Sequence, residues 1–248
     1  YAVDWVRDAE SADTALTTLL LAAGLTLGVS PLVLAETSLT WTGCYAGLNA
    51  GYVWSNVSGD FLGYAGEPLD PYDIGSATLT GGAVGGQLGC DYQRDKIVIG
   101  GRVAMDWTNT SGSHVFRDGT SPNDRMAYDL QYFGTLTARL GYLFQPATLG
   151  YLSGGYAWGK TEHTDSDPTP GYGLSPYSTS FDLDRSGWTL GLGVEHRFQP
   201  NLSLFLAYDY IDFGNKDTLV SCACSSDLER YEFDQNMSLL SLGLNYRF

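Results

Sequence analysis

Histidine and cysteine are the residues of this chain that could support nucleophilic, redox or metal chemistry, and both are scarce: 3 His and 4 Cys in 248 residues. Nucleophilic catalysis needs a His beside a Ser or Cys, oriented by a third group. His114 and His163 fall in segments rich in Gly, Ser and Asp, and His196 follows a run of alternating apolar residues. None of the three shows a Ser-His-acid spacing, so we expect a protein that is not an enzyme.

Cys222 and Cys224 are separated by one residue in a polar segment. A disulfide between them would be strained, and pairing between two molecules is the alternative. A structural zinc site needs four ligands, and the sequence places no His or further Cys near this pair. The glycine clusters at 81–86 and 191–193 are not followed by a helix, as a nucleotide-binding loop would be. We therefore expect neither a metal nor a cofactor.

The charge balance limits the partners of the chain. It carries 13 Lys and Arg against 28 Asp and Glu, a net charge of −15, whereas nucleic-acid phosphates attract basic surfaces. We therefore expect no nucleic-acid partner. The 31 Gly and 17 Tyr, without any long helical periodicity, favour an all-β protein.

The first 40 residues differ from the rest. Residues 16–35 form an uncharged apolar run that ends in Val-Leu-Ala, which predicts a cleaved secretory signal peptide. A single transmembrane helix is the alternative, since the length is just sufficient. Residues 1–15 carry four acids and one base, unlike the basic start of a signal peptide, so we interpret them as a non-native or upstream extension. Residues 36–40 are then a short linker before a domain at 41–248.

That domain divides into eight segments of alternating character, at 41–57, 78–93, 97–109, 126–144, 148–161, 181–198, 202–213 and 232–248. Three-residue connections at 94–96, 145–147 and 199–201 alternate with long polar ones at 58–77, 110–125, 162–180 and 214–231. An even number of strands with short turns on one side and long loops on the other is typical of bacterial outer-membrane barrels.

The two-residue period of a strand is clear in several of these segments. In 97–109 one face is apolar, with Ile97, Ile99, Val103, Met105 and Trp107, and the other carries Val98, Gly100, Arg102, Ala104 and Asp106. In 126–144 the apolar face runs Tyr128, Leu130, Tyr132, Leu136, Leu140, Tyr142 and Phe144. Segment 148–161 shows no dominant face, so we expect a bulge or phase change there.

Alternation alone does not distinguish a soluble barrel, which buries its apolar face, from a membrane barrel, which exposes that face to lipid. Two features favour the membrane. Aromatic residues gather at both ends of the apolar faces, at Trp107, Tyr128, Tyr132, Tyr208 and Tyr210, and at Tyr142, Phe144, Phe198, Tyr246 and Phe248. Many glycines lie on the polar face, where a narrow interior leaves little room. The sequence predicts an all-β fold, an eight-stranded antiparallel up-and-down transmembrane β-barrel.

The polar face of this barrel would hold charges inside a narrow space, where they are costly unless paired. We expect an interior polar network of Asn49, Gln87, Arg102, Asp106, Arg139, Glu195, Arg197 and Asp209. Eight strands leave an interior that side chains can fill, which favours a salt-bridged plug. A solute-selective pore is the alternative.

Strand pairing also brings two cysteines together. Cys44 lies near the start of the first segment and Cys90 near the end of the second. Antiparallel pairing places both at the short-turn rim in the phase of the lipid face. We expect a Cys44–Cys90 disulfide, since exported proteins retain such bonds.

Seven stretches of the sequence resemble the alphaproteobacterial outer-membrane immunogenic proteins, which belong with the opacity-protein-like surface antigens and porin-family eight-stranded barrels. They are WTGCYAGLNAGY (41–52), GGAVGGQLGCDYQ (81–93), GTLTARLGYLF (134–144), YLSGGYAW (151–158), GWTLGLGVEHRF (187–198), LAYDYIDFG (206–214) and LGLNYRF (242–248). The resemblance implies a bacterial outer-membrane surface protein. It also implies that Leu240, Leu242, Leu244, Tyr246 and Phe248 form the C-terminal signal that barrel assembly machinery recognises.

The expected role is structural, in envelope integrity and surface interaction, with outer-membrane lipid and lipopolysaccharide as partners. Two alternatives remain: a small passive porin-like channel, and binding of a host molecule or haem by the long loops. Twelve carboxylates in or beside these loops are expected to be solvated or to contact lipopolysaccharide through bridging cations: Asp60, Glu67, Asp70, Asp73, Asp118, Asp124, Glu162, Asp165, Asp167, Asp217, Asp227 and Glu229.

Overall fold

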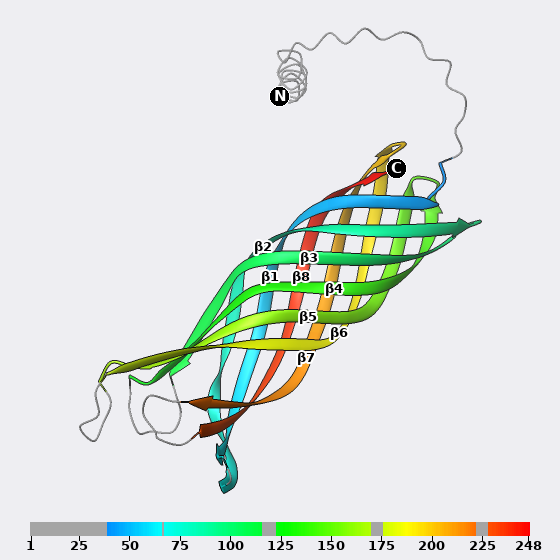
Figure 1. Cartoon of the computed structure of the whole chain (residues 1–248). Helices are drawn as coiled ribbons and strands as arrows, with labels where there is room; N and C mark the ends of the chain where they lie inside the picture. Colours follow the sequence, from blue (N-terminus) through cyan, green and yellow to red (C-terminus); the bar gives the residue numbers. More distant parts are fainter. Residues whose placement is uncertain (1–38, 66, 116–122, 170–175, 222–227) are drawn as a thin grey trace, which may run out of the picture. The chain divides into compact units, whose positions relative to one another are not determined.

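A computed structural model describes residues 39–65, 67–115, 123–169, 176–221 and 228–248. These contain eight strands: β1 (Gly43–Tyr64), β2 (Glu67–Arg94), β3 (Ile97–Val115), β4 (Arg125–Gln145), β5 (Thr148–Asp167), β6 (Tyr177–Gln199), β7 (Leu202–Ser221) and β8 (Leu228–Arg247). Each strand pairs antiparallel with the next, and β8 pairs with β1, so the sheet closes into a barrel (Figure 1). The predicted fold class is confirmed. Among these described residues no helix is long and apolar enough to cross a bilayer.

Several predicted features lie outside the described residues. These are the extension at 1–15, the signal peptide at 16–35, most of the linker at 36–40, and the pair Cys222 and Cys224. Asp118 and Asp227, two of the predicted loop carboxylates, also lie there.

One end of the barrel carries three two-residue turns, at 95–96, 146–147 and 200–201, and is called the short-turn end below. Asp95 adopts a left-handed backbone with φ of 55°, a conformation that Asp tolerates better than most residues. The opposite, long-loop end differs from the prediction, because the strands continue into most of the expected loops. The segment 58–77 is mainly a hairpin formed by the ends of β1 and β2.

Near the short-turn end the outward face is apolar over a band about as tall as a bilayer core. On β8 and the residue that follows it, this face runs Leu240, Leu242, Leu244, Tyr246 and Phe248, all exposed. The segment 240–248 is nine residues long, which agrees with the 9–11 residues that a tilted strand needs to cross a membrane. Exposed aromatic residues border the band at the short-turn end (Tyr92, Tyr142, Phe144, Phe198, Tyr246 and Phe248) and at its other margin (Tyr52, Trp107, Tyr156 and Trp188).

The prediction for β4 was wrong on the long-loop side of Tyr132. The register between β4 and its neighbour β5 shifts between Leu130 and Tyr132, so Gln131 is an extra residue in β4. Such a bulge reverses the phase of the residues beyond it. Tyr128 and Leu130 therefore point into the barrel, with exposures of 0% and 2%, and do not belong to the outer aromatic row.

The bulge expected in the fifth segment is absent from β5, whose described residues pair with β6 without a register shift. Its inward positions keep one phase from Leu149 to Asp167. The dominant face was hidden because small residues occupy much of the strand.

Beyond the aromatic margin the barrel wall divides into two sheets. In the described residues, β6 pairs with β7 only as far as Trp188 and Asp212, and β2 pairs with β3 only as far as Thr80 and Ser111. Figure 1 shows the ribbons of β3–β6 separating from those of β7, β8, β1 and β2. The strand polarity also reverses here, with apolar side chains inward and polar ones outward.

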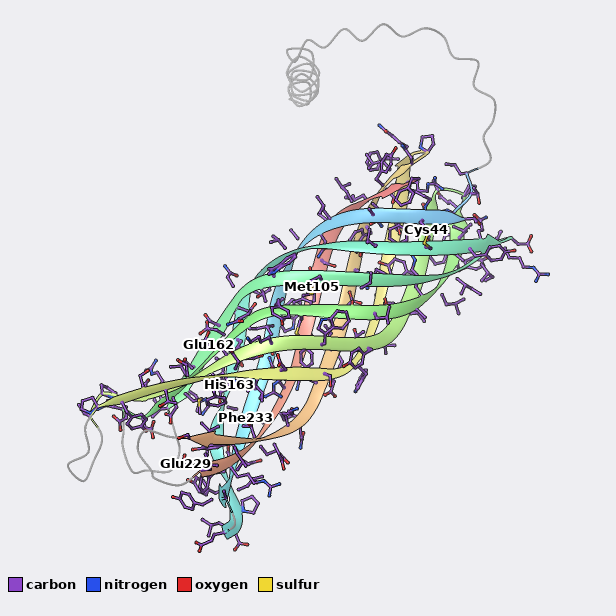
Figure 2. The ribbon with its side chains drawn as sticks, viewed as in Figure 1. Cys44, Met105, Glu162, His163, Glu229 and Phe233 are labelled. Atoms are coloured by element: carbon purple, nitrogen blue, oxygen red, sulfur yellow. A yellow bond between two sulfur atoms is a disulfide. The ribbon has the colours of Figure 1, made fainter. Side chains whose placement is uncertain are left out.

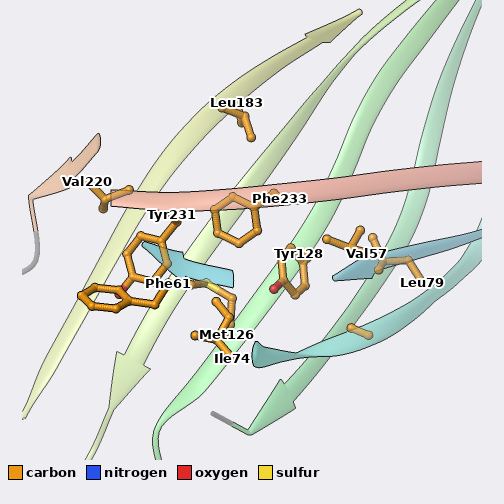
Figure 3. Packing of buried hydrophobic residues seen from close by; sticks show 11 residues of the cluster. Val57, Phe61, Ile74, Leu79, Met126, Tyr128, Leu183, Val220, Tyr231 and Phe233 are labelled. Carbon is orange, nitrogen blue, oxygen red and sulfur yellow. The ribbon is translucent and has the colours of Figure 1, made fainter. Parts of the chain in front are cut away.

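The side chains between the two sheets form a hydrophobic core (Figure 3). Its members come from both sheets: Val57, Phe61, Ile74, Ala77, Leu79, Met126, Tyr128, Leu183, Val220, Tyr231 and Phe233. The predicted inside-out polarity therefore holds for the membrane band alone. Outside the band the same strands form two sheets with apolar side chains packed between them, as in a water-soluble β-sandwich.

Candidate functional site

The candidate site is a polar network inside the membrane band. Its first layer surrounds Arg139 of β4. The Nε atom of Arg139 donates to Oδ1 of Asp91 at 2.7 Å, and its Nη1 donates to Oε2 of Glu195 at 3.0 Å. Arg247 donates from Nη2 to Oδ2 of Asp91 at 2.6 Å. Two arginines and two carboxylates thus neutralise each other, as a buried ion cluster requires.

The second layer lies closer to the long-loop end. Nη2 of Arg102 lies 3.4 Å from Oδ1 of Asp209, and Asn49 donates from Nδ2 to Asp106. All four are on the inward face of their strands.

Two amides join the layers. Gln87 donates from Nε2 to Oδ1 of Asn245 at 2.6 Å and accepts from Nη1 of Arg102 at 3.4 Å. Asn245 in turn donates from Nδ2 to Oε1 of Glu195 at 3.0 Å. The hydrogen bonds therefore run without a break from Arg247 to Asp209.

Inward glycines provide the space for this network. A Cβ atom added to Gly100 would lie 2.1 Å from Oδ1 of Asp91, and one added to Gly191 would lie 2.1 Å from Oδ1 of Asp209. The carboxylates occupy the volume that a neighbouring side chain would otherwise fill. This explains why so many glycines lie on the polar face of the strands.

Seven of the eight residues predicted for the network lie in it, and Arg197 lies elsewhere. Its Nη1 donates to the carbonyl oxygen of Thr40, and its guanidinium lies 5.3 Å from the ring centre of Trp41. Arg197 forms no ion pair with any residue that the structure describes.

The prediction missed Asp91, the carboxylate that binds both Arg139 and Arg247. Asp91 shares the phase of Gln87 on β2 and directly follows Cys90, which was placed on the lipid face. The alternation therefore contained the signal, although glycine dilutes the pattern of this strand. Asn245 and Arg247, which alternate with the predicted outward row ending in Phe248, also belong to the network and were missed.

Little space is left between these side chains. A cavity of about 20 Å³ is lined by residues of the second layer, among them Asn49, Arg102 and Asp209. This is room for about one water molecule. An apolar cluster closes the lumen on the long-loop side, formed by Val53, Ala83, Leu130, Phe133, Ala157, Ile211, Phe213, Met237 and Leu239.

The predicted disulfide is confirmed. Cys44 and Cys90 are directly opposite on β1 and β2, with a Cα–Cα distance of 3.9 Å, on the outward face at the short-turn end. Figure 2 shows Cys44 near this end and Glu229 near the other.

The C-terminal residues complete the barrel wall. Tyr246 pairs with Ala46, and the backbone nitrogen of Phe248 donates to the carbonyl oxygen of Cys44 at 3.1 Å. Leu240, Leu242, Leu244, Tyr246 and Phe248 all lie on the outward face.

Acidic groups gather inside the long-loop end, where a solvated surface was expected. Asp165, Asp167 and Glu229 are buried on inward faces. Burial and the neighbouring Asp124 carboxylate raise the pKa of Asp165 to about 8. Tyr231 donates to Oε2 of Glu229 at 2.7 Å. No group of three His, Cys, Asp or Glu residues in the described ranges is arranged to bind a metal.

His163 was expected in a loop but is a fully buried residue of β5. Its ring packs against Tyr128, Phe181 and Phe233 at centroid distances of 4.8–5.2 Å. Burial, followed by the positive charge of Arg185, lowers the pKa of His163 to about 3, so the imidazole is neutral. His114, also expected in a loop, lies on β3.

Comparison with known proteins agrees with this geometry. The family model of the outer membrane protein beta-barrel domain matches residues 18–248. The 31 kDa outer-membrane immunogenic protein of Brucella melitensis is 30% identical over 213 residues, 85% of each chain. The 25 kDa outer-membrane immunogenic protein of the same species is 26% identical over 212 residues, 84% of this chain and 80% of that one.

Among solved structures, the outer membrane protein OprG from Pseudomonas aeruginosa has a TM-score of 0.54. The likeness covers 84% of this chain and 97% of that one at 11% sequence identity, and it shows a shared fold.

Proposed function

The chain belongs to the outer membrane protein beta-barrel domain family, and on this premise we propose that it is a closed structural barrel that supports the envelope and presents an acidic surface outside the cell. It is an integral outer-membrane protein related to outer-membrane immunogenic proteins. In such barrels the short turns face the periplasm and the long connections face outward.

The observation that carries the closed barrel is the unbroken network from Arg247 to Asp209. A conducting pore of this width would need ions to pass between Arg139 and its two carboxylate partners, which lie 2.7 Å and 3.0 Å away. Breaking a buried ion pair of this kind is costly, because it leaves charges without partners in a medium of low dielectric constant. The cavity of about 20 Å³ is also too small for an organic solute.

Planar-bilayer recording of the purified, refolded chain tests the closed barrel. We expect no steady single-channel conductance at either polarity, because no water-filled path crosses the network. Steady channels from the wild-type chain would contradict the closed barrel and favour the alternative, a small passive channel.

The outward carboxylates beyond the aromatic margin support the surface role. Asp129, Glu162 and Asp182 are directly opposite one another on β4, β5 and β6. Like charges in this arrangement repel, and of the three only Asp182 has an ion-pair partner among the described residues, Lys160 at 2.7 Å. One or two carboxylates together with phosphates form the usual binding site of a magnesium ion. We propose that divalent cations bridge this carboxylate row, defined as Asp129, Glu162 and Asp182, to lipopolysaccharide phosphates.

The proposed role is not catalytic. His196 lies on the outward face of the short-turn end, and buried His163 packs among aromatic rings, with no Ser, Cys or carboxylate hydrogen-bonded to its ring among the described residues. Neither arrangement supports an activated nucleophile. We also propose that the outward row ending in Phe248 is the segment that assembly machinery recognises. Binding of a host molecule or haem by the loops stays a prediction.

A further inference from the structure

Trp41 is a buried residue that does not belong to the barrel wall. It precedes β1, which begins at Gly43, and its exposure is 0%. Thr40 and Thr42 are exposed, whereas the indole ring of Trp41 packs inside the short-turn end of the barrel. A tryptophan before the first strand would ordinarily stay at the interface with lipid headgroups. Trp41 is instead buried inside the short-turn end of the barrel.

Groups from separate parts of the rim hold the Trp41 backbone and ring. The backbone nitrogen of Trp41 donates to Oε1 of Gln93, on β2, at 2.7 Å. The indole Nε1 donates to the carbonyl oxygen of Pro146, in the turn between β4 and β5, at 3.1 Å. Both indole and backbone donors are thus satisfied, as buried polar groups require.

Two arginines, on β6 and β8, hold Trp41. The guanidinium groups of Arg197 on β6 and Arg247 on β8 lie 5.3 Å and 5.4 Å from the indole ring centre, within the range of a cation–π contact. Arg247 also donates from Nη1 to the carbonyl oxygen of Trp41 at 2.6 Å, and Arg197 donates to that of Thr40. This gives Arg197, which lies outside the ion network, a binding partner.

An apolar layer also packs against Trp41. Trp41 packs in one cluster with Val98, Leu143, Leu149 and Tyr151, which come from β3, β4 and β5. Val98, Leu143 and Leu149 carry no polar side-chain atom. Arg247 links Trp41 to the first network layer, because it also donates from Nη2 to Oδ2 of Asp91 at 2.6 Å.

We propose that Trp41 is a lid that seals the barrel interior from the periplasm, held shut by Arg197 and Arg247. The lid shares Arg247 with the ion network, and its other contacts are with the rim and the apolar layer. It goes beyond the closed-barrel role, since it assigns the exclusion of periplasmic water to a segment outside the barrel wall.

Thiol accessibility beneath the lid tests this proposal. Val98→Cys places a probe of similar size in the apolar layer, at a position with 0% exposure. Cys222 and Cys224 are changed to serine in every variant, and the Cys44–Cys90 disulfide stays intact. A charged methanethiosulfonate reagent is added to the refolded protein, and its attachment is followed by mass spectrometry. We expect the thiol to be protected when Trp41 is present. Trp41→Ala should speed the reaction by about tenfold or more, equal to about 1.4 kcal/mol of lost protection.

Val53→Cys is the matched control, because Val53 is equally buried but lies in the apolar cluster on the far side of the network. It should stay protected with or without Trp41. Equal rates for the Val98→Cys thiol with and without Trp41, whether fast or slow, would overturn the lid. If Trp41→Ala exposes the Val53→Cys thiol as well, the variant has unfolded. Trp41→Leu then replaces it, and an unchanged rate at Val98→Cys overturns the proposal.

Discussion

Asp91 and Arg139 meet across Gly100. The two residues lie on β2 and β4, and in the pairing of both strands with β3 each is opposite Gly100. The glycine has no side chain to separate them, so Nε of Arg139 reaches Oδ1 of Asp91 at 2.7 Å. Their contact joins three neighbouring strands at the centre of the ion network.

Arg139→Ala should strongly destabilise the barrel. It leaves the buried carboxylates of Asp91 and Glu195 with fewer positive partners, a loss of about 3–5 kcal/mol for a broken buried pair. Urea unfolding in lipid vesicles, followed by tryptophan fluorescence, measures the change. Lys160→Ala is the control, because Lys160 pairs with Asp182 at 2.7 Å on the solvated outer face. It should change stability little, and equal effects of the two substitutions would contradict the network.

Gly100→Ala should destabilise the barrel while Gly101→Ala should not. The added methyl at position 100 would lie 2.1 Å from Oδ1 of Asp91, whereas the nearest atom to one at position 101 is 3.9 Å away. Overpacking of this kind costs about 1–3 kcal/mol. The same urea titration compares the two variants. Loss of stability in Gly101→Ala alone would show that the inward glycines do not make space for the carboxylates.

Asp165→Asn should make the stability of the long-loop end less dependent on pH. Burial beside Asp124 raises the pKa of Asp165 to about 8, above its value in the unfolded chain. At a pH between the unfolded and folded pKa values of Asp165, the folded state binds more protons than the unfolded state. Stability therefore falls as pH rises between these two pKa values, and it levels off above about pH 8. Wild type should lose its compact, unboiled gel form at a lower temperature at about pH 9 than at about pH 5.

The control for this experiment is Asp217→Asn. A hydrogen bond from Arg230 lowers the pKa of Asp217, so this carboxylate is ionised across the whole interval. Its substitution should leave the difference between the two pH values unchanged. If Asp165→Asn keeps the wild-type difference, Asp165 is not the group that causes the effect.

Neutralising the carboxylate row should weaken cation-dependent binding of lipopolysaccharide. A variant with Asp129→Asn, Glu162→Gln and Asp182→Asn is mixed with lipopolysaccharide micelles in magnesium, and binding is measured before and after chelation. Wild type should lose binding on chelation, and the variant should bind weakly throughout. Asp70→Asn, on the β1–β2 hairpin, is the control and should behave as wild type. Binding that chelation does not affect would contradict bridging cations.

Alternation along the chain was enough to predict the barrel. On β3 every inward residue from Val98 to Asp106 was assigned from the two-residue period, and the structure places them so. The opposed positions of Cys44 and Cys90 followed from pairing two neighbouring strands across one connection. These features are local in sequence or depend on adjacent strands alone, which is why the sequence contains them.

The tertiary structure decided what depends on distant residues. One extra residue, Gln131, turned Tyr128 and Leu130 inward, and a single sequence does not mark where a strand slips against its neighbour. The reversal of polarity beyond the aromatic margin was hidden, because an apolar row looks the same whether lipid or a second sheet covers it. The partners of Asp91, and the entry of Trp41 into the lumen, depend on side chains up to 206 positions apart. The sequence by itself thus determined which residues share a face of a strand, because alternation follows from the backbone of the strand. Only the closed barrel decided what each face contacts, because contacts depend on how distant strands pack in three dimensions.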